Sequence, residues 1–215
     1  MPLQVNEIFY SIQGESSYAG WPCAFVRLTG CNLRCSYCDT AYAYSEGACY
    51  SIGEIARQIA SYKSPLVEIT GGEPLIQDET PALVGALLER GYTVLLETNG
   101  SQDISRVDTR CVKIVDIKCP SSGQSEANDL NNLRRLTERD EVKFVIGNRE
   151  DYDYAAKALS LMTQPATAKR QIHFSPVFGR MTPEGLAKWI LDDNLNVRLH
   201  LQIHKLIWSP GDRGV

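Results

Sequence analysis

Three cysteines lie close together in the segment CNLRCSYCDT, at Cys31, Cys35 and Cys38. Their spacing is C-x3-C-x2-C, and the segment contains no fourth cysteine. A [4Fe–4S] cluster normally takes four thiolates, so a cluster held by three keeps one iron with an open position for a small molecule. An open coordination position marks a reactive metal site. The triplet therefore predicts a fold that gathers these three thiols at one reactive site.

A zinc site or an electron-transfer ferredoxin would use the same thiols differently. Zinc takes four ligands, often as a C-x2-C pair joined by a distant pair. The fourth ligand would be Cys23, Cys49 or one of the three histidines, and none of these completes a familiar spacing. A ferredoxin would normally use a fourth thiolate. An open cluster is more consistent with the spacing than either alternative.

The chain has 215 residues, of which 43% are hydrophobic and 22% are charged. We expect a single domain over residues 1–215, with one buried core. The net charge of −4, without a basic run, argues against direct binding to nucleic acid. No apolar stretch approaches the ~20 residues of a membrane span, and the N-terminus lacks a signal-peptide pattern. We therefore expect a cytoplasmic protein whose seven cysteines form no disulfide framework.

Short apolar runs alternate with helix-like stretches along the chain. The runs read as buried strands because they are brief, apolar and bounded by turn residues. We expect strands at residues 24–28, 66–70, 93–97, 112–117, 141–146, 171–174 and 198–203. Alternation of strands with helices is typical of a parallel sheet that has helices on its outside.

Helix signals lie between most of these strands. Ser51 and Glu54 form a capping box at the start of one helix. Further helices are expected at residues 78–90, 149–162 and 182–192, and Gly91 is a stop signal for the first of these. A complete eightfold barrel needs about 250 residues. The sequence therefore predicts an α/β fold, a partial TIM-like (β/α)6 barrel of mostly parallel strands, with the cluster loop after the first barrel strand.

The unusual polar residues all follow predicted strands. The cysteine loop follows residues 24–28, and similar groups follow the later strands at Gly71–Glu73, Thr98–Gly100, Lys118, Ser121, Ser175, Pro176, His204 and Lys205. Chemistry in parallel α/β folds gathers at the carboxyl ends of the strands. We therefore expect these groups to meet at one rim.

The cysteine loop, with Tyr37 directly before its last cysteine, resembles the radical S-adenosylmethionine superfamily. The segment TGGEP, which contains Gly72 and Glu73, matches the GGE motif of that superfamily, although a glycine pair alone often marks only a turn. The resemblance implies that S-adenosylmethionine chelates the open iron. One electron from the reduced cluster then gives a 5′-deoxyadenosyl radical, which removes a hydrogen atom from the substrate.

The opening stretch EIFYSIQGESSYAGWPCAFVRLTGCNLRCSYCDT resembles the 7-carboxy-7-deazaguanine synthase family within that superfamily. The likeness continues through TGGEP, ETNG, DIKCPSSG and a late HK, and so covers nearly the whole chain. It implies conversion of 6-carboxy-5,6,7,8-tetrahydropterin to 7-carboxy-7-deazaguanine with release of ammonia, in 7-deazapurine and queuosine biosynthesis. It also implies a magnesium ion, a homodimer, and a flavodoxin or ferredoxin as electron donor.

The resemblance also implies roles for individual residues. Arg27 would bind the substrate carboxylate with a bidentate fork, although a surface arginine beside a strand is equally consistent with the sequence. The remaining substrate contacts would be Ile12, Gln13, Gly14, Glu15 and Thr70, of which the first four are also compatible with a simple turn. Thr40 is the family's magnesium position, although a lone hydroxyl is a modest ligand and a local hydrogen bond is the ordinary alternative.

The cofactor S-adenosylmethionine would be bound by Tyr37, Cys38, Asp39, Gly72, Glu73, Ser121 and Ser122, with help from Asn99. His204 and Lys205 would close the pocket, or else form a solvated strand edge. Pro210 and Val215 are further candidates near the C-terminal end. The other cysteines are expected to be structural and packed away: Cys23, Cys49, Cys111 and Cys119.

Two other functions remain open at this point. A glycyl-radical-enzyme activase would share the cluster and a partial barrel, but its peptide substrate offers no carboxylate to Arg27. A non-catalytic iron–sulfur or zinc interaction module would keep the cysteines without cleaving S-adenosylmethionine. Cleavage of S-adenosylmethionine by the reconstituted protein separates the last alternative from the two enzymes.

Overall fold

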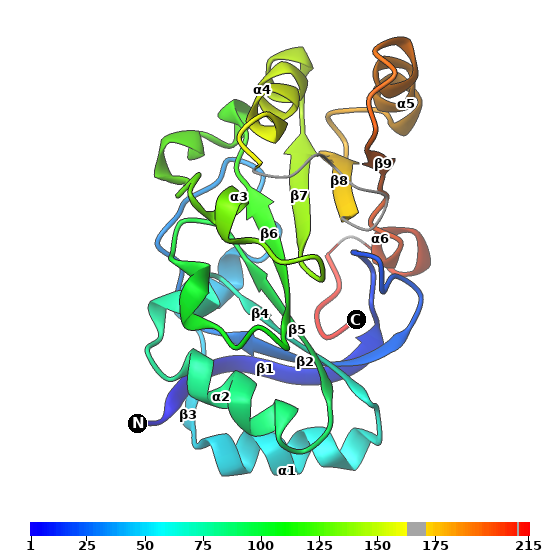
Figure 1. Cartoon of the computed structure of the whole chain (residues 1–215). Coiled ribbons are helices and arrows are strands. Elements are labelled where there is room, and N and C mark those ends of the chain that lie inside the picture. The colour runs from blue at the N-terminus through cyan, green and yellow to red at the C-terminus, as the bar shows by residue number, and fades with distance from the viewer. Residues whose placement is uncertain (163–170, 210) are drawn as a thin grey trace.

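The computed structural model describes residues 1–162, 171–209 and 211–215. Its centre is one curved sheet in which nine strands follow the order β3-β1-β2-β4-β5-β6-β7-β8-β9 (Figure 1). From β2 to β9 every neighbouring pair is parallel. The predicted α/β fold, a partial barrel of mostly parallel strands, is confirmed, and the cluster loop follows β2, its first parallel strand.

The parallel strands lie close to the predicted ranges. They are β2 (Pro22–Leu28), β4 (Leu66–Gly71), β5 (Thr93–Thr98), β6 (Val112–Ile117), β7 (Glu141–Ile146), β8 (Gln171–Pro176) and β9 (Arg198–Leu199). The prediction for residues 198–203 is wrong beyond Leu199. There the backbone N–H of His200 still donates to the Phe174 carbonyl, but the chain then turns and a helix begins at His204.

The first strands of the chain were not predicted. β1 (Leu3–Ile12) pairs antiparallel with β2 along its length, and β3 (Ala48–Tyr50) pairs antiparallel with β1. These two strands cover the edge of the parallel sheet next to β2. An antiparallel hairpin needs no crossover helix. Because Ile12 pairs with Pro22, the first residue of β2, the segment between β1 and β2 lies at the edge where the parallel strands begin.

The helices are α1 (Ile52–Tyr62), α2 (Thr80–Leu88), α3 (Asn132–Arg135), α4 (Arg149–Leu159), α5 (Pro183–Asp192) and α6 (His204–Ile207). The capping box at Ser51 and Glu54 is present, and Thr182 caps α5. Short 3-10 turns occupy η1 (Ala41–Tyr44), η2 (Pro74–Ile76), η3 (Ile104–Arg106), η4 (Pro120–Ser122) and η5 (Ser125–Ala127). Several of these turns directly follow parallel strands and shape the rim.

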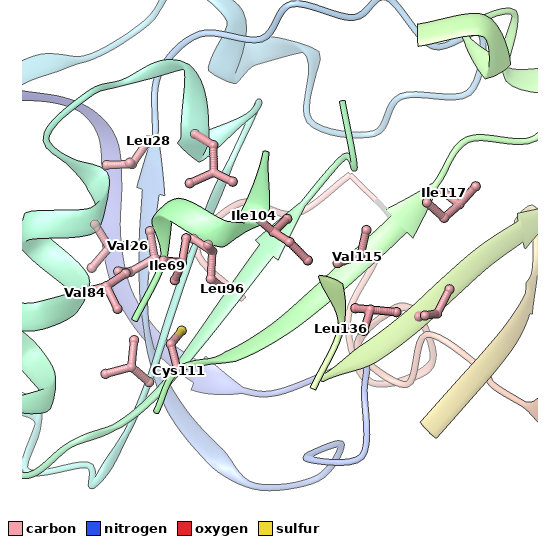
Figure 2. Packing of buried hydrophobic residues seen from close by; sticks show 14 of the residues in the cluster. Val26, Leu28, Ile69, Val84, Leu96, Ile104, Cys111, Val115, Ile117 and Leu136 are labelled. Carbon is pink, nitrogen blue, oxygen red and sulfur yellow. The ribbon is translucent and has the colours of Figure 1, made fainter. Parts of the chain in front are cut away.

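The main core lies between the sheet and its outer helices. Val26, Ile69, Leu96 and Val115 come from four strands and are fully buried in one cluster with Val84 of α2 (Figure 2). A second, smaller cluster lies among residues of the opposite strand faces: Phe9, Cys23, Phe25, Leu66, Leu95, Val112 and Ile114. Successive side chains along a strand point to opposite faces of the sheet, and here both faces have buried apolar residues. Polar residues lie at the rim and in part of the interior.

Among the described residues, none of the helices combines the length and apolar character needed to cross a membrane.

Candidate active site

A cavity of about 390 Å³ opens at the carboxyl ends of the parallel strands. Its wall comes from the end of β1, the cysteine loop, the residues after β4 and β5, the inner faces of β6 and β7, and the segment that leads into α6. All three predicted cluster cysteines line it. Part of the predicted convergence is present: the cysteines meet residues that follow or end four other strands, whereas five of the groups expected at this rim do not line the cavity, namely Glu73, Gly100, Ser121, Ser175 and Pro176.

The cysteine loop directs hydrogen-bond donors at its first thiol. Cys31 Sγ accepts from the Leu33 backbone N–H at 3.4 Å and from Asn99 Nδ2 at 3.8 Å. Hydrogen bonds to sulfur tune the reduction potential of an iron–sulfur cluster. Burial raises the pKa of the Cys31 and Cys35 thiols, and iron binding would hold both as thiolates because a coordinated thiol is deprotonated. The loop fits a cluster.

Glycine is required where the loop after β4 meets the cysteine loop. A Cβ on Gly72 would lie 2.1 Å from the Gly30 carbonyl oxygen and 2.6 Å from Cys31 Cβ. Gly71 has φ +149°, and a Cβ there would lie 2.2 Å from the Leu28 carbonyl oxygen. The two backbones can approach only because neither residue has a side chain. This contact fixes Cys31 against the end of β4.

Ser36 fastens the other side of the cysteine loop to later parts of the chain. Its backbone N–H donates to the Ser122 carbonyl at 3.0 Å, and its Oγ donates to the Ser121 carbonyl at 2.8 Å. Arg180 donates to Ser36 Oγ and to its carbonyl, both at 3.2 Å. The loop that carries the thiols is therefore held from η4 and from the turn before α5.

Arg27 projects from β2 into the cavity wall. Its Nε donates to Glu7 Oε1 at 2.8 Å, and its guanidinium lies 5.6 Å from the centre of the Phe9 ring and 5.9 Å from that of Tyr42. A guanidinium presents five N–H groups in a planar fork. Glu7 and the two rings orient the guanidinium of Arg27 from its Nε side. The two terminal nitrogens have the geometry to donate to a carboxylate.

A buried lysine joins three carboxyl groups in the cavity wall. Lys143 Nζ lies 2.7 Å from Glu15 Oε2 and 3.6 Å from Asp116 Oδ2, and it also donates to Glu97. Burial acts to lower the pKa of Lys143, but the three carboxylates outweigh it and keep the lysine charged. For Glu15 burial acts to raise the pKa, and the ion pair with Lys143 overcomes it and lowers the pKa.

Two further charged groups complete the interior wall. Lys118 Nζ donates to Asp116 Oδ2 at 2.8 Å. Burial acts to lower the pKa of Lys118, whereas Asp116 and the nearby Cys35 both act to raise it. Glu68 is buried and accepts from Gln13 Nε2. Burial, followed by the nearby Glu97 and Glu15, raises the pKa of Glu68 well above its ordinary value. Glu68 therefore favours its neutral form more than an exposed carboxyl group does.

The first and last parts of the chain meet over the cavity. A Cβ on Gly14 would lie 2.0 Å from His204 Nδ1, so the His204 ring packs directly on the Gly14 backbone. Gln202 Nε2 donates to Glu15 Oε1 at 2.7 Å, and Lys205 Nζ donates to Asp39 Oδ2 at 2.6 Å. Burial acts to raise the pKa of Asp39, but Lys205 overcomes it and lowers the pKa. These contacts close one side of the cavity.

Most of the predicted site residues line this cavity. They are Ile12, Gln13, Gly14, Glu15, Arg27, Cys31, Cys35, Tyr37, Cys38, Asp39, Thr40, Thr70, Gly72, Asn99, His204, Lys205 and Val215. Pro210 lies outside the described residues.

Glu73, Ser121 and Ser122 do not line the cavity, and their contact with a cofactor stays a prediction. Glu73 is fully buried and accepts from Leu75 N–H at 2.9 Å, Thr98 Oγ1 at 2.8 Å and Asn99 N–H at 2.6 Å. Its carboxyl group ties the end of β4 to the end of β5.

The two serines have structural partners of their own. Ser121 donates to Asp151 from its backbone N–H at 2.8 Å and from its Oγ at 2.5 Å, and Ser122 Oγ donates to the Cys119 carbonyl at 2.6 Å. Through the carbonyl groups that bind Ser36, both residues position the cysteine loop.

The remaining cysteines differ in burial. Cys23, Cys111 and Cys119 are fully buried in the two apolar clusters, as predicted. Cys49 is exposed, which contradicts the expectation that it is packed away, and it accepts from Gln4 Nε2 at 2.8 Å. It lies on β3 and does not line the cavity. Each of the seven thiols is free.

Comparisons with known proteins agree with this geometry. Residues 25–110 match the model of the Radical SAM superfamily. The chain is 49% identical to the 7-carboxy-7-deazaguanine synthase of Chlorobaculum tepidum over 100% of this chain and 98% of the relative. It is 43% identical to the enzyme of the same name from Koribacter versatilis, over 99% of this chain and 100% of the relative. The chain belongs to the 7-carboxy-7-deazaguanine synthase family.

A solved structure has a similar fold. The crystal structure of QueE from Escherichia coli matches with a TM-score of 0.78 over 94% of each chain, at 24% sequence identity. Membership of the 7-carboxy-7-deazaguanine synthase family, an enzyme family, sets aside both a glycyl-radical activase and a non-catalytic interaction module. Membership of the radical superfamily also implies a [4Fe–4S] cluster and S-adenosylmethionine, and the three convergent thiols fit that pair.

Sequence reasoning missed the charged inner wall of this 7-carboxy-7-deazaguanine synthase family member. Glu68, Glu97, Asp116 and Lys143 all line the cavity, and each lies inside a strand directly after a buried apolar residue. An ionisable residue within an otherwise buried strand was the available signal, because such residues are rarely buried without a partner. The signal shows which residues face inward, but the partner of each follows only from the tertiary structure.

Proposed function

We propose that this protein converts 6-carboxy-5,6,7,8-tetrahydropterin to 7-carboxy-7-deazaguanine with release of ammonia. The full-length identity of 49% to a 7-carboxy-7-deazaguanine synthase carries this proposal. The cavity adds chemical support, because it combines three cluster thiols with one arginine and several carboxyl groups. The substrate has the matching features: a carboxylate tail and an edge of amide and amino groups.

Arg27 binds the substrate carboxylate in this proposal. Glu7 and the Phe9 and Tyr42 rings hold the guanidinium by its Nε edge, which turns a flexible side chain into a fixed one. A prepositioned arginine loses less side-chain entropy when it binds a carboxylate bidentately. Thr70 is the register neighbour of Arg27 on β4 and adds a hydroxyl on the same side.

The pterin edge is bound by the segment from Ile12 to Glu15. Gln13 is held by its own contacts, since its Oε1 accepts from the Glu15 N–H at 3.0 Å and its Nε2 donates to Glu68. The backbone of Ile12 and Gly14 and the carboxylate of Glu15 are therefore the groups that contact the substrate. Carboxylate oxygens accept from the N–H groups that a pterin presents.

The cofactor lies against the rim of the cysteine loop. Tyr37, Asp39, Gly72 and the Cys38 region line that part of the cavity, while Glu73, Ser121 and Ser122 act by positioning it. When bound, the cluster and S-adenosylmethionine supply the one-electron chemistry that removes a hydrogen atom from the substrate. The residues of this chain orient the two ligands and exclude water from them.

Thr40 is proposed as a magnesium ligand. It lines the cavity, and its Oγ1 lies 3.8 Å from Cys38 Sγ. Magnesium prefers carboxylates, waters and substrate oxygens, so the substrate carboxylate and water complete the shell. We further propose a homodimer in the cytoplasm that a flavodoxin or a ferredoxin reduces.

The test is anaerobic reconstitution with iron and sulfide, followed by incubation with S-adenosylmethionine, magnesium, a reductant and carboxytetrahydropterin. We expect one 7-carboxy-7-deazaguanine and one ammonia per substrate consumed. The Cys35→Ala variant provides the control, because it removes one cluster ligand and should abolish product formation while the fold remains. A reconstituted protein that cleaves S-adenosylmethionine but leaves the pterin unchanged would contradict the substrate assignment.

A further inference from the structure

Glu7 and Arg27 face each other across the first two strands of the sheet. They are register partners in the antiparallel pair of β1 and β2, and that pairing shifts register between Val5 and Glu7. A shift of this kind redirects the side chains that follow it. Arg27 lines the cavity, whereas Glu7 does not. Glu7 therefore affects a bound ligand through Arg27, whose guanidinium it orients.

One carboxylate oxygen of Glu7 accepts from two side chains. Arg27 Nε donates to Oε1 at 2.8 Å, and the Tyr42 hydroxyl donates to the same atom at 2.9 Å. A tyrosine hydroxyl is protonated at neutral pH and can donate in this way. Two donors on one oxygen restrict how the carboxylate turns, and the carboxylate restricts how the guanidinium turns. Tyr42 therefore contributes to the orientation of Arg27, although it does not line the cavity.

Arg213 holds the ring of Tyr42. Its guanidinium carbon lies 3.8 Å from the centre of the ring, and its Nη1 donates to Glu46 Oε2 at 2.9 Å. The backbone of Glu46 is fixed in turn, because its carbonyl accepts from Asn6 Nδ2 at 2.8 Å and from Thr29 Oγ1 at 2.7 Å. A guanidinium can stack on a ring and pair with a carboxylate at the same time. Arg213 therefore joins the Tyr42 ring to a fixed point beside β1.

The backbone that follows Arg213 passes over the same place. A Cβ on Gly214 would lie 3.9 Å from Phe9 Cβ and 4.0 Å from Glu7 Oε2. Gly214 has φ +71°, a left-handed conformation that favours glycine. The next residue, Val215, lines the cavity. Residues 213–215 thus run from the Tyr42 ring, across Glu7, to the cavity wall.

We propose that Tyr42 and Arg213 are positioning residues that make the cavity selective for pterins with a carboxylate group. The proposal rests on the function proposed above, in which Arg27 binds the substrate carboxylate. Arg213 fixes the Tyr42 ring, and the Tyr42 hydroxyl fixes Glu7. Glu7 then fixes the plane of the Arg27 fork, which a bidentate contact with a carboxylate requires. A pterin without the carboxylate makes no such contact, so its binding does not depend on Tyr42 or Arg213.

The test compares two ligands that differ by one carboxylate, 6-carboxypterin and pterin. Both are fluorescent, so titration of anaerobically reconstituted protein gives their Kd values. The wild type should bind 6-carboxypterin more tightly than pterin. Tyr42→Phe keeps the ring but removes the donor to Glu7. It should weaken 6-carboxypterin binding roughly tenfold, since a hydrogen bond to a charged group contributes about that much, and leave the Kd of pterin unchanged.

Turnover gives a second measurement on the same variant. In Tyr42→Phe the KM for carboxytetrahydropterin should rise by the factor found for 6-carboxypterin, while kcat stays at the wild-type value. The reason is that the carboxylate contact is the same in the bound substrate and in the transition state. Cleavage of S-adenosylmethionine without substrate should also match the wild type.

Arg213→Gln tests the outer end of the chain of contacts. It should weaken 6-carboxypterin binding roughly threefold, because a half-exposed cation on a ring contributes less than a hydrogen bond to a charge. Because Arg213 acts through the Tyr42 hydroxyl, the double variant Tyr42→Phe with Arg213→Gln should bind 6-carboxypterin no more weakly than Tyr42→Phe alone.

Two matched controls lie elsewhere on the molecule. Tyr62→Phe removes a hydroxyl that donates to the Ile8 carbonyl on β1 at 3.1 Å. Arg110→Gln removes an arginine whose side chain is 55% exposed, against 53% for Arg213, and which pairs with carboxylates at 2.8 Å. Neither control residue lines the cavity, and both variants should keep the wild-type Kd for each ligand.

The proposal is overturned if Tyr42→Phe and Arg213→Gln keep the wild-type Kd for 6-carboxypterin. It is also overturned if either variant weakens both ligands by the same factor, because that result would indicate a merely structural role. A double variant that binds 6-carboxypterin threefold more weakly than Tyr42→Phe would contradict action of Arg213 through Tyr42. Failure of the proposed function looks different, because the wild type itself would then bind 6-carboxypterin and pterin equally.

Discussion

Two buried lysines on neighbouring strands have opposite surroundings. Lys113 on β6 pairs with a single carboxylate, Asp140, at 3.0 Å, and this pair lies outside the cavity. Lys143 on β7 lies among Glu15, Glu97 and Asp116 inside the cavity wall. Both lysines are buried to a similar degree, since their side chains are 3% and 5% exposed. Burial alone therefore does not distinguish a structural charge from one at a ligand site.

The balance of charge distinguishes the two sites. The Asp140 carboxylate neutralises Lys113 and also accepts from the backbone N–H groups of Lys113 and Thr137 at 2.9 and 2.7 Å. That pair is complete without a ligand. Around Lys143 the carboxyl groups outnumber the lysine, and Glu97 has its pKa raised chiefly by burial. An unequal set of charges costs stability, and it leaves acceptors for a ligand that carries N–H groups.

The largest effect is expected for Lys143→Met, which leaves three carboxyl groups without their shared cation. Glu15 would then lose its fixed position, because Lys143 and Gln202 are the groups that hold it. We expect kcat/KM for carboxytetrahydropterin to fall roughly 100-fold, since misplacement of a binding group by ~1 Å has that effect. Product formation after reconstitution measures it, with cluster content checked by iron analysis.

Lys113→Met is the matched variant and should separate stability from activity. Removing one partner of a buried ion pair costs about 3 kcal/mol, because the remaining charge stays buried and unpaired. Urea unfolding should report that loss, while kcat/KM at a temperature where the protein stays folded should equal the wild-type value. If Lys113→Met reduces kcat/KM as much as Lys143→Met does, the distinction between the two lysines is wrong.

A double variant tests whether the outer pair is replaceable. Lys113→Met combined with Asp140→Asn removes both charges, and the introduced amide keeps one oxygen to accept a backbone N–H. We expect the double variant to be less destabilised than the sum of its single variants by about 1 kcal/mol or more, because contacting residues are not additive. If urea unfolding shows that the destabilisation of the double variant equals the sum for the two single variants, the two residues have no coupling energy.

The smallest effect concerns Glu68, whose folded-state pKa is raised well above 4.5 by burial. A raised folded pKa means that the stability which this group contributes is complete below 4.5 and is lost as pH rises toward the folded pKa. Glu68→Gln mimics the neutral form, so the free energy of unfolding of this variant should fall less than that of the wild type as the pH rises from 4.5 toward the raised folded-state pKa of Glu68. Thermal unfolding of both proteins as a function of pH is the measurement. An equal decline in their free energies of unfolding would contradict the raised pKa of Glu68.

Much of the fold follows from local patterns that tertiary contacts do not override. The strands at β6 and β7 begin and end where their apolar runs do, and the Ser51 capping box starts α1 as expected. β1 was missed because its identity as a strand depends on pairing with β2, a contact that periodicity does not report. The last predicted strand was too long because packing on Gly14 makes the chain turn into α6 near His204.

The sequence predicted the site residues that line the cavity because of their place in the chain. It predicted less well the residues whose role depends on contacts with distant parts of the chain. Cys31, Arg27 and Thr40 line the cavity because strand ends bring them there. Glu73 belongs to the GGE motif, but its carboxyl group accepts hydrogen bonds from three donors, which lie after β4 and at the end of β5. The spacing of residues in the sequence does not indicate these hydrogen bonds. Lys143 depends on carboxyl groups from three other segments of the chain, and only the curved sheet of the folded protein brings them together.

The fastening of Ser36 has a consequence for how the protein matures. A growing polypeptide that had emerged only as far as Thr40 would carry all three cluster thiols. It would lack the Ser121 and Ser122 carbonyls and the Arg180 guanidinium that hold Ser36 in the finished molecule. The thiols thus acquire their final arrangement late in synthesis.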